Sequence, residues 1–194
     1  MNNLLEQQDN LQKEANLLIE KLELKSILNN IGIMSVVGSL ELGLMTWRDI
    51  DIEVFVETLD RNSISEVVKQ LLNKTVNRID FTFIDNKNEY LPAMPLGLYL
   101  GIKYKITKDI VWKIDTWFVS GTHSEGFKQI AELKSKLTDE FKLIILNIKN
   151  QIADNPKYKK EVMSVDIYDA VLNHKIESME EFNNYLKKRG KSLD

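Results

Sequence analysis

The chain has 194 residues, of which 43% are hydrophobic and 28% are charged, a composition that is typical of a globular protein and argues against long linkers or disorder. General nucleic-acid binding needs a dense basic face, and a formal net charge of -3 argues against one, so we expect small-molecule or protein substrates. The absence of cysteine excludes disulfides and thiolate metal sites, and the absence of an export signal or of about 18 consecutive apolar residues predicts a cytoplasmic protein outside the membrane.

The first third of the chain predicts one long helix followed by two strands. Residues 4–29 carry an apolar stripe at helical spacing and end before Gly32, so we expect a helix that packs on a sheet. The next apolar run ends at Val37 and is typical of a buried strand. Residues 50–56 then alternate with period two, which predicts a strand with one face in the core. The inward face comprises Ile50, Ile52, Val54 and Val56, and the outward face comprises Asp49, Asp51 and Glu53.

The middle of the chain predicts a second helix and three more strands. Asn62 or Ser63 caps a helix that runs to about residue 72. A strand over 78–84 follows, and a polar loop with two prolines then leads to a strand over about 97–106. The last strand, over 110–119, begins after a short polar turn, so we expect the last two strands to form an antiparallel hairpin.

From residue 124 onward the sequence predicts helices only. One apolar stripe begins after Thr138 and stops before Pro156, as expected for a helix with a polar N-terminal turn. Two shorter helices fit 164–173 and 179–189, and the second of them opens with a capping box at Ser178.

One short segment between the first two strands carries most of the chemistry. Gly38-Ser39 ends the buried strand, and Asp49-Ile50-Asp51 opens the next one. Backbone N–H groups at such a turn, with the Ser39 hydroxyl, can hold phosphate oxygens, and Gly38 leaves the phosphate room to approach. Asp49 and Asp51 project side by side from one strand face and suit a hard cation such as Mg²⁺ that is shared with substrate phosphates. The alternatives are a simple strand-to-helix turn and a solvated strand edge.

This segment resembles the signature of the nucleotidyltransferases with the DNA-polymerase-β-type fold, in which an apolar residue, Gly-Ser or Gly-Gly, and a spacer precede Asp-apolar-Asp. The corresponding residues here are Val37-Gly38-Ser39, Gly43 and Asp49-Ile50-Asp51-Ile52. Two features depart from the family pattern. Leu40-Glu41-Leu42 stands where many small members carry a basic residue, and the spacer after Gly43 is shorter than the commonest form. The text IYDAVLNHKIESMEEFNNYL is also similar to the C-terminal segment of some stand-alone bacterial members, which include antibiotic and minimal nucleotidyltransferases.

The resemblance implies an α+β nucleotidyltransferase fold, with a mixed sheet of about five strands flanked by helices. We expect a catalytic core over 1–123 and a helical region over 124–194 packed on it. The implied reaction is transfer of a nucleoside monophosphate, AMP from ATP, with two Mg²⁺ ions as cofactors. Asp49 and Asp51 would hold the metal, and Gly38 and Ser39 would bind the nucleotide.

The family places a third carboxylate on a later strand, and the sequence offers Asp115 and Asp80. We choose Asp115 as a catalytic and metal-binding residue, because an acid inside so apolar a strand is costly unless it is paired or metal-bound. The alternative for Asp115 is an ion pair with Lys103, Lys105 or Lys113. Asp115 would bind the metal nearer the acceptor and take the acceptor's proton.

Other residues near these motifs have a functional and a structural interpretation each. Glu53 is a second candidate base or a polar residue at the end of its strand. Arg48 pairs with the triphosphate or with a local acid. Tyr99, Lys103 and Lys105 are candidates for contacts with the phosphates or the base, and the alternative for them is a solvated strand face. His123 is a candidate for a position near the site, and the alternative is a loop histidine.

The acceptor is open at this point. The family resemblance allows a small hydroxylated acceptor such as an aminoglycoside or lincosamide antibiotic. It also allows a protein side chain, as in antitoxin-like members that adenylylate a partner, whereas RNA is disfavoured by the acidic balance. A different class is a noncatalytic nucleotide-binding or interaction module. The intact Asp49, Asp51 and Asp115 speak against such a module, and Glu41 in the phosphate turn speaks for it.

Overall fold

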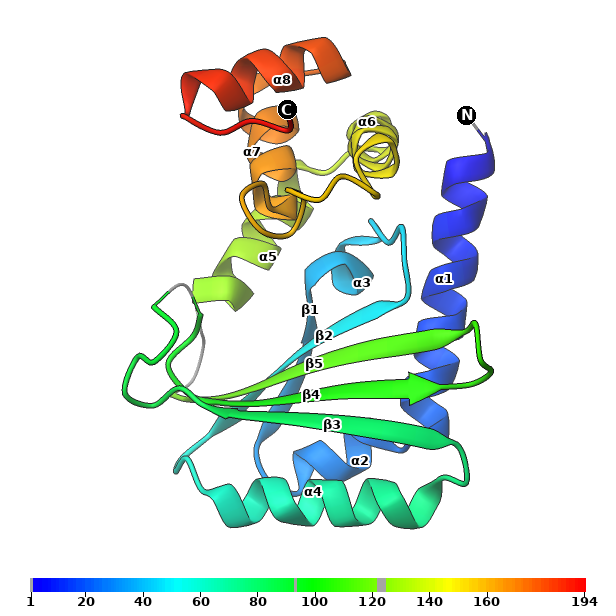
Figure 1. Ribbon diagram of the computed structural model, residues 1–194, viewed down its shortest axis with the longest axis vertical. Helices are drawn as coiled ribbons and strands as arrows, with labels where there is room; N and C mark the ends of the chain where they lie inside the picture. Colours follow the sequence, from blue (N-terminus) through cyan, green and yellow to red (C-terminus); the bar gives the residue numbers. More distant parts are fainter. Residues whose placement is uncertain (1, 93, 122–124) are drawn as a thin grey trace.

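The fold is built on one five-stranded mixed sheet (Figure 1). The computed structural model describes residues 2–92, 94–121 and 125–194. Along the sheet the strand order is β1-β2-β5-β4-β3. The strands are β1 Ile33–Val37, β2 Asp49–Val56, β3 Arg78–Asp85, β4 Leu98–Lys105 and β5 Val111–Ser120. β2 and β5 run parallel, and the other neighbouring pairs run antiparallel, so two strands far apart in the sequence meet at the centre of the sheet.

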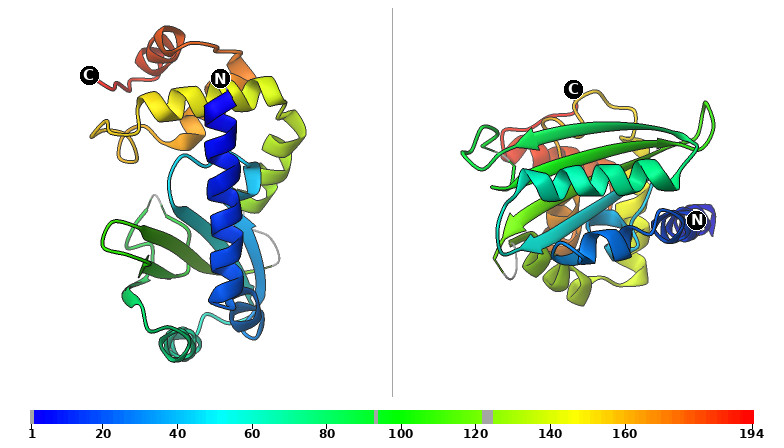
Figure 2. Two further views of the ribbon diagram at one scale, coloured as in Figure 1. Left: turned by 90° about the vertical axis from the view of Figure 1, so that its right-hand side faces the viewer. Right: turned by 90° about the horizontal axis from the view of Figure 1, so that it is seen from below.

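Three helices cover one face of this sheet and enclose the larger hydrophobic core. They are α1 Asn2–Lys21, α2 Leu24–Asn29 and α4 Arg61–Lys74. Their apolar stripes pack on the inward residues of the strands, such as Ile52, Leu100 and Ile114, which are at most 2% exposed. Figure 2 shows that α1 runs along the side of the molecule while α4 crosses the sheet. The alternation predicted for β2 is therefore confirmed, because its apolar positions face this core.

A second hydrophobic cluster lies on the other side of the sheet and joins the C-terminal helices. They are α5 Glu125–Lys136, α6 Asp139–Gln151, α7 Ser164–His174 and α8 Met179–Lys188. Buried residues of α6, α7 and α8 pack against Leu42 and Leu44, which belong to the short helix α3 Gly38–Leu42 and the loop after it. Leu4 and Leu5 of α1 also pack against this cluster, so α1 contributes to both. The segment from Gly38 to Leu44 therefore lies where the sheet and the helical region meet.

The predicted fold class is confirmed, and the predicted strands agree with the observed ones to within one or two residues. The expected β4-β5 hairpin is antiparallel, as predicted. The single helix predicted over 4–29 is wrong, because the chain breaks at Glu23, which adopts a left-handed conformation with φ of 51°. Among the described residues, no helix combines the length and apolarity that a membrane crossing requires.

Candidate active site

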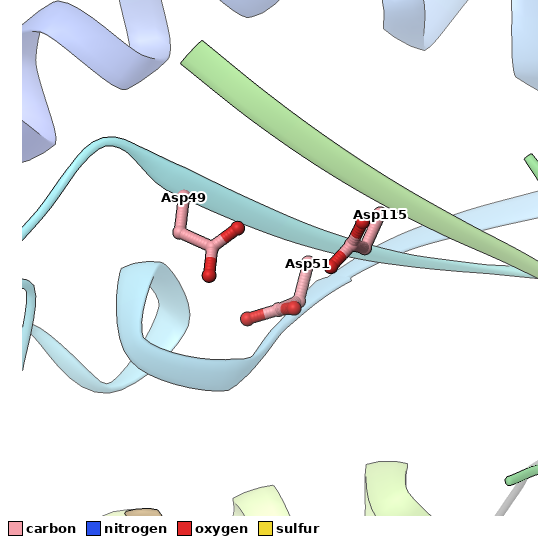
Figure 3. Close-up of side chains that lie close together, drawn as sticks. All are labelled: Asp49, Asp51 and Asp115. Atoms are coloured by element: carbon pink, nitrogen blue, oxygen red, sulfur yellow. The ribbon is translucent and has the colours of Figure 1, made fainter. Parts of the chain in front are cut away.

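Three aspartates from two neighbouring strands meet on the sheet face opposite the larger core (Figure 3). Asp49 and Asp51 come from β2, and Asp115 comes from β5, directly opposite Asp51 in the parallel register. One carboxylate oxygen of each residue lies within 4.8 Å of those of the other two. Period-two alternation makes this possible, since it turns all three side chains to the same face. Of the two candidates for a third acid, the structure brings Asp115 into the group.

Asp80, the other candidate, lies on the edge strand β3 and takes part in surface ion pairs. Its carboxylate lies 2.9 Å from Lys105 Nζ and 3.2 Å from Arg78 Nε. Hydrogen bonds from these two cations, first from Lys105, hold the pKa of Asp80 below its usual value. Lys105 is thereby engaged away from the three aspartates.

The three aspartates form a strongly repulsive group that nearby lysines partly neutralise. Burial, followed by the charges of Asp49 and Asp115, raises the pKa of Asp51 to about 7. Lys113 of β5 forms an ion pair with Asp115 and lies 4.0 Å from Asp49. Lys159, from the loop between α6 and α7, lies 3.7 Å from Asp49 Oδ2. The pairing of Asp115 with Lys113 was one of the alternatives left open by the sequence, and it coexists with the aspartate group.

The two carboxylate oxygens of Asp49 have different surroundings, since Lys113 Nζ lies 4.0 Å from Oδ1 while Trp47 and Lys159 contact Oδ2. The Trp47 indole Nε1 donates a hydrogen bond of 3.2 Å to Asp49 Oδ2. Lys159 Nζ lies 3.7 Å from the centroid of the Trp47 ring, a distance typical of a cation–π contact. By contrast, Asp49 Oδ1 is buried and accepts no hydrogen bond from any part of the chain that the structure describes. A buried carboxylate oxygen without a donor is costly, and a bound cation would satisfy it.

The turn at Gly38 packs directly against this group. Val37, the last residue of β1, lies opposite Asp51, so Gly38 begins α3 at the site itself. Gly38 has φ of 66°, and a Cβ at this position would lie 2.2 Å from Asp51 Oδ2. Only glycine fits both the backbone conformation and the space. Ser39, the next residue, is buried, and Glu41 forms an ion pair with Lys134 of α5.

Tyr99 lies directly beside the aspartate group. Its hydroxyl donates a hydrogen bond of 2.6 Å to Asp115 Oδ1, and its ring packs 5.1 Å from that of Trp117. Burial, followed by the hydrogen bond to Asp115, raises the pKa of the Tyr99 phenol. The sequence grouped Tyr99 with Lys103 and Lys105 on one strand face. A usable signal was Gly101, since a glycine within an otherwise apolar strand marks close approach of another group.

Lys149 of α6 is a site neighbour that the sequence analysis missed. Its side chain is fully buried, and its ammonium group donates a hydrogen bond of 2.6 Å to the Leu44 carbonyl oxygen. Burial, followed by the charge of Lys159, lowers the pKa of Lys149 to about 7. Nζ also lies 4.9 Å from the centroid of the Trp47 ring. The available signal was helical spacing, because Lys149 lies four residues after the buried Ile145 and so shares its face.

The structure describes two further candidates from the sequence, Arg48 and Glu53, but not the third, His123. Arg48 pairs with Glu14 of α1 at 3.0 Å, which agrees with the salt-bridge interpretation. Glu53 is buried, two residues beyond Asp51 on the same strand. His123 lies outside the described residues.

No protein-family model matches the sequence, and no curated protein matches it significantly. Solved structures do match. Cid1 poly(U) polymerase bound to MgATP is 19% identical with a TM-score of 0.61, and the alignment covers 90% of this chain and 53% of that one. A cytoplasmic RNA terminal U-transferase is 19% identical with a TM-score of 0.57, covering 84% and 46%. A STING-associated CdnE c-di-GMP synthase from Capnocytophaga granulosa is 16% identical with a TM-score of 0.55, covering 93% and 67%.

The chain has the nucleotidyltransferase fold. It spans about half the length of the first two proteins that it matches. At identities below 20%, the likeness concerns the arrangement of the backbone, so the activity has to be argued from the residues of this chain.

Proposed function

We propose that the chain is a Mg²⁺-dependent nucleotidyltransferase. The observation that carries this proposal is the group formed by Asp49, Asp51 and Asp115, with the Gly38 turn packed against it. Without a bound cation such a group destabilises the fold, because carboxylates of like charge repel one another in a partly buried site. The fold supports the proposal as well, since Cid1 poly(U) polymerase, which shares it, binds MgATP.

The donor set fits a hard divalent cation. Carboxylate oxygens are the ligands that Mg²⁺ prefers, and the three of them lie close enough to share ions. Asp49 Oδ1, which accepts no hydrogen bond from the described residues, would gain a partner. When bound, two Mg²⁺ ions would neutralise charge on the attacking and leaving oxygens of an in-line displacement at phosphorus.

The protein residues have separable tasks in this proposal. Asp49 and Asp51 would hold the metal, and Asp115 would hold it nearer the acceptor and take the acceptor's proton. Gly38 keeps the backbone beside Asp51 open, so that the N–H groups of the turn and the Ser39 hydroxyl hold the β- and γ-phosphates. Lys113 and Lys159 supply positive charge at the same place, where a triphosphate brings negative charge.

We propose AMP, from ATP, as the transferred group and a hydroxyl of a small molecule, such as an antibiotic, as the acceptor. The net charge of -3 supports a small acceptor over RNA. The proteins that share the fold include an RNA terminal U-transferase and a c-di-GMP synthase, so the fold alone leaves the base and acceptor open. We also propose the division into a catalytic core over 1–123 and a helical region over 124–194. The larger hydrophobic cluster supports this division, because all of its members lie within the first part.

Thermal unfolding in the presence of each nucleoside triphosphate tests the proposal. We expect Mg²⁺ and a triphosphate together to raise the melting temperature of the wild type, and this rise to disappear in the Asp49→Asn, Asp51→Asn double variant. Asp80→Asn is the matched control, because it removes an acid on the same sheet outside the site. If no triphosphate gives a metal-dependent rise in the wild type, the chain is a noncatalytic module. If the rise is present, pyrophosphate release in an acceptor screen identifies the acceptor.

A further inference from the structure

The Tyr99 hydroxyl occupies a chemically distinctive position. It lies 2.6 Å from Asp115 Oδ1, and the second oxygen of Asp115 is paired with Lys113. Asp115 is thus held from both sides, and one of its two partners is a hydroxyl that carries a transferable proton. The same carboxylate belongs to the aspartate group, whose ligand atoms lie within 4.8 Å of one another. A hydroxyl of the chain itself therefore lies where an acceptor hydroxyl would have to lie.

The sheet is built to hold Tyr99 in this position. Asp115 lies opposite Gly101 in the antiparallel β4-β5 register, and Tyr99 lies opposite Trp117. The Tyr99 side chain extends over Gly101, where a Cβ would lie 2.4 Å from the phenolic oxygen and 2.8 Å from Cζ. The ring of Trp117, 5.1 Å away, also packs against the tyrosine ring. A glycine within an interior strand lowers stability, so the room that Gly101 leaves for the Tyr99 ring comes with a loss of stability. A tyrosine on an open surface would not need such a glycine.

We propose that Tyr99 is itself a nucleotidyl acceptor, so that the chain modifies its own β4 strand. This inference rests on the proposed function. In the step, the phenolic oxygen of Tyr99 bonds to the α-phosphorus of a nucleoside triphosphate. The bond from that phosphorus to the oxygen bridging to the β-phosphate breaks, and pyrophosphate leaves with the electron pair. The phenolic proton passes to Asp115 Oδ1, which already accepts the hydrogen bond. The product is a phosphodiester between tyrosine and nucleoside, and no oxidant or reductant is needed.

Two properties follow from the geometry. The modification occurs within one molecule, since Tyr99 and Asp115 lie on adjacent strands of one sheet. It is also self-limiting, because the attached nucleotide removes the hydroxyl that bonds Asp115 and fills the acceptor side of the site. The side chain is only half-buried, so the phenol is accessible to a nucleotide bound at the aspartates.

The test is to incubate the purified full chain with Mg²⁺ and each nucleoside triphosphate labelled at the α-phosphate, with γ-labelled triphosphate in parallel. We expect the α-label alone to remain on the protein, and tandem mass spectrometry to locate it on Tyr99. Labelling per molecule should be independent of protein concentration. Tyr99→Phe should lose the label, and Asp51→Asn should lose it as well. Tyr90→Phe, the same change at an exposed loop tyrosine, should keep it.

Thermal unfolding of the same samples separates the possible failures. If Tyr99 is an acceptor, Tyr99→Phe keeps the rise in melting temperature with Mg²⁺ and triphosphate. If the wild type shows an Asp51-dependent rise but no label on Tyr99, the inference is wrong and the proposed function stands. Label that persists in Tyr99→Phe, or that wild-type protein transfers to the Asp51→Asn variant, also overturns it. If the wild type shows no Asp51-dependent rise, both proposals fall together.

Discussion

Asp51 is the residue at which the electrostatic cost of the site is concentrated. Burial and two neighbouring acids raise its pKa to about 7, whereas an aspartate in an unfolded chain titrates near 4. Between these values the folded state binds a proton that the unfolded state releases. The free energy of unfolding must therefore fall as pH rises from about 4 to about 7, and the loss is complete above the folded pKa. In the proposed function, this loss of stability accompanies carboxylates that are already in place for a cation.

The first prediction is that Asp51→Asn removes this loss. Without metal, the stability of the variant should be closest to that of the wild type near pH 4 and should exceed it near pH 8, by on the order of a few kcal/mol. Urea unfolding in the presence of a chelator, at several pH values, measures the difference. Asp80→Asn is the control with the opposite sign, because hydrogen bonds lower the pKa of Asp80. A variant whose stability follows that of the wild type at every pH would disprove the assigned shift.

Lys149 gives a second prediction with the reverse dependence on pH. Its burial lowers the pKa to about 7, so between about pH 7 and pH 10 the unfolded state holds a proton that the folded state lacks. The free energy of unfolding of the wild type should rise over this range by on the order of a few kcal/mol, and Lys149→Met should abolish the rise. Lys160→Met, at an exposed lysine, should leave it unchanged. The same rise in Lys149→Met would show that another group is responsible.

At the scale of the elements, β4 links a glycine to the position of a tyrosine. Gly101→Ala alone would place a methyl group 2.4 Å from the Tyr99 phenolic oxygen, so we expect it to destabilise the fold by about 1 kcal/mol or more. In a Tyr99→Ala background the obstruction is gone, and the same change should stabilise by roughly 0.5 to 1 kcal/mol, because alanine suits a strand interior better than glycine. A double-mutant cycle in urea measures this coupling. Additive effects would mean that the ring does not depend on Gly101.

The break between α1 and α2 makes another prediction at this scale. Glu23 adopts a left-handed backbone there and pairs with Lys74 at 2.6 Å. Glu23→Gly and Glu23→Ala both lose this exposed ion pair, but only glycine relaxes the backbone. We expect the glycine variant to be more stable than the alanine variant by about 1 kcal/mol, although alanine is the better helix former. Chemical unfolding of both variants checks the order, and the reverse order would mean that a continuous helix forms.

These elements also show how far the sequence can predict the structure. Period-two alternation physically fixes which face a strand residue occupies, so the common face of Asp49 and Asp51 followed from the pattern. Local patterns do not encode which strands pair, and the opposition of Asp51 and Asp115 is a tertiary result. The helix break at Glu23 could not be predicted, because no glycine marks the left-handed position there. The contact of Lys159 with Asp49 depends on how α6 and α7 pack, which periodicity cannot specify.

At the scale of the whole molecule, the site lies between the two hydrophobic clusters and depends on both. The larger cluster supports β2 and β5, and the second one holds the segment that leads from α3 into β2. Trp47 connects the two parts, because it donates to Asp49 and packs edge-on against Tyr158 at 5.5 Å. Lys134 of α5 pairs with Glu41 of α3. The helical region is therefore part of the wall of the site.

The last prediction concerns a fragment that ends at residue 121. The larger cluster lies entirely within it, so we expect circular dichroism to show a folded sheet. Leu42 and Leu44, each at most 2% exposed in the full chain, lose the members of their cluster that lie after residue 121, so the fragment should be less stable and should bind a hydrophobic dye. The fragment also loses Lys159, and it loses Tyr158, against which Trp47 packs. The rise in melting temperature with Mg²⁺ and triphosphate should therefore disappear even though Asp49, Asp51 and Asp115 are all present. A fragment that keeps this rise would show that the core alone forms the site, and that the helical region serves the acceptor or a partner instead.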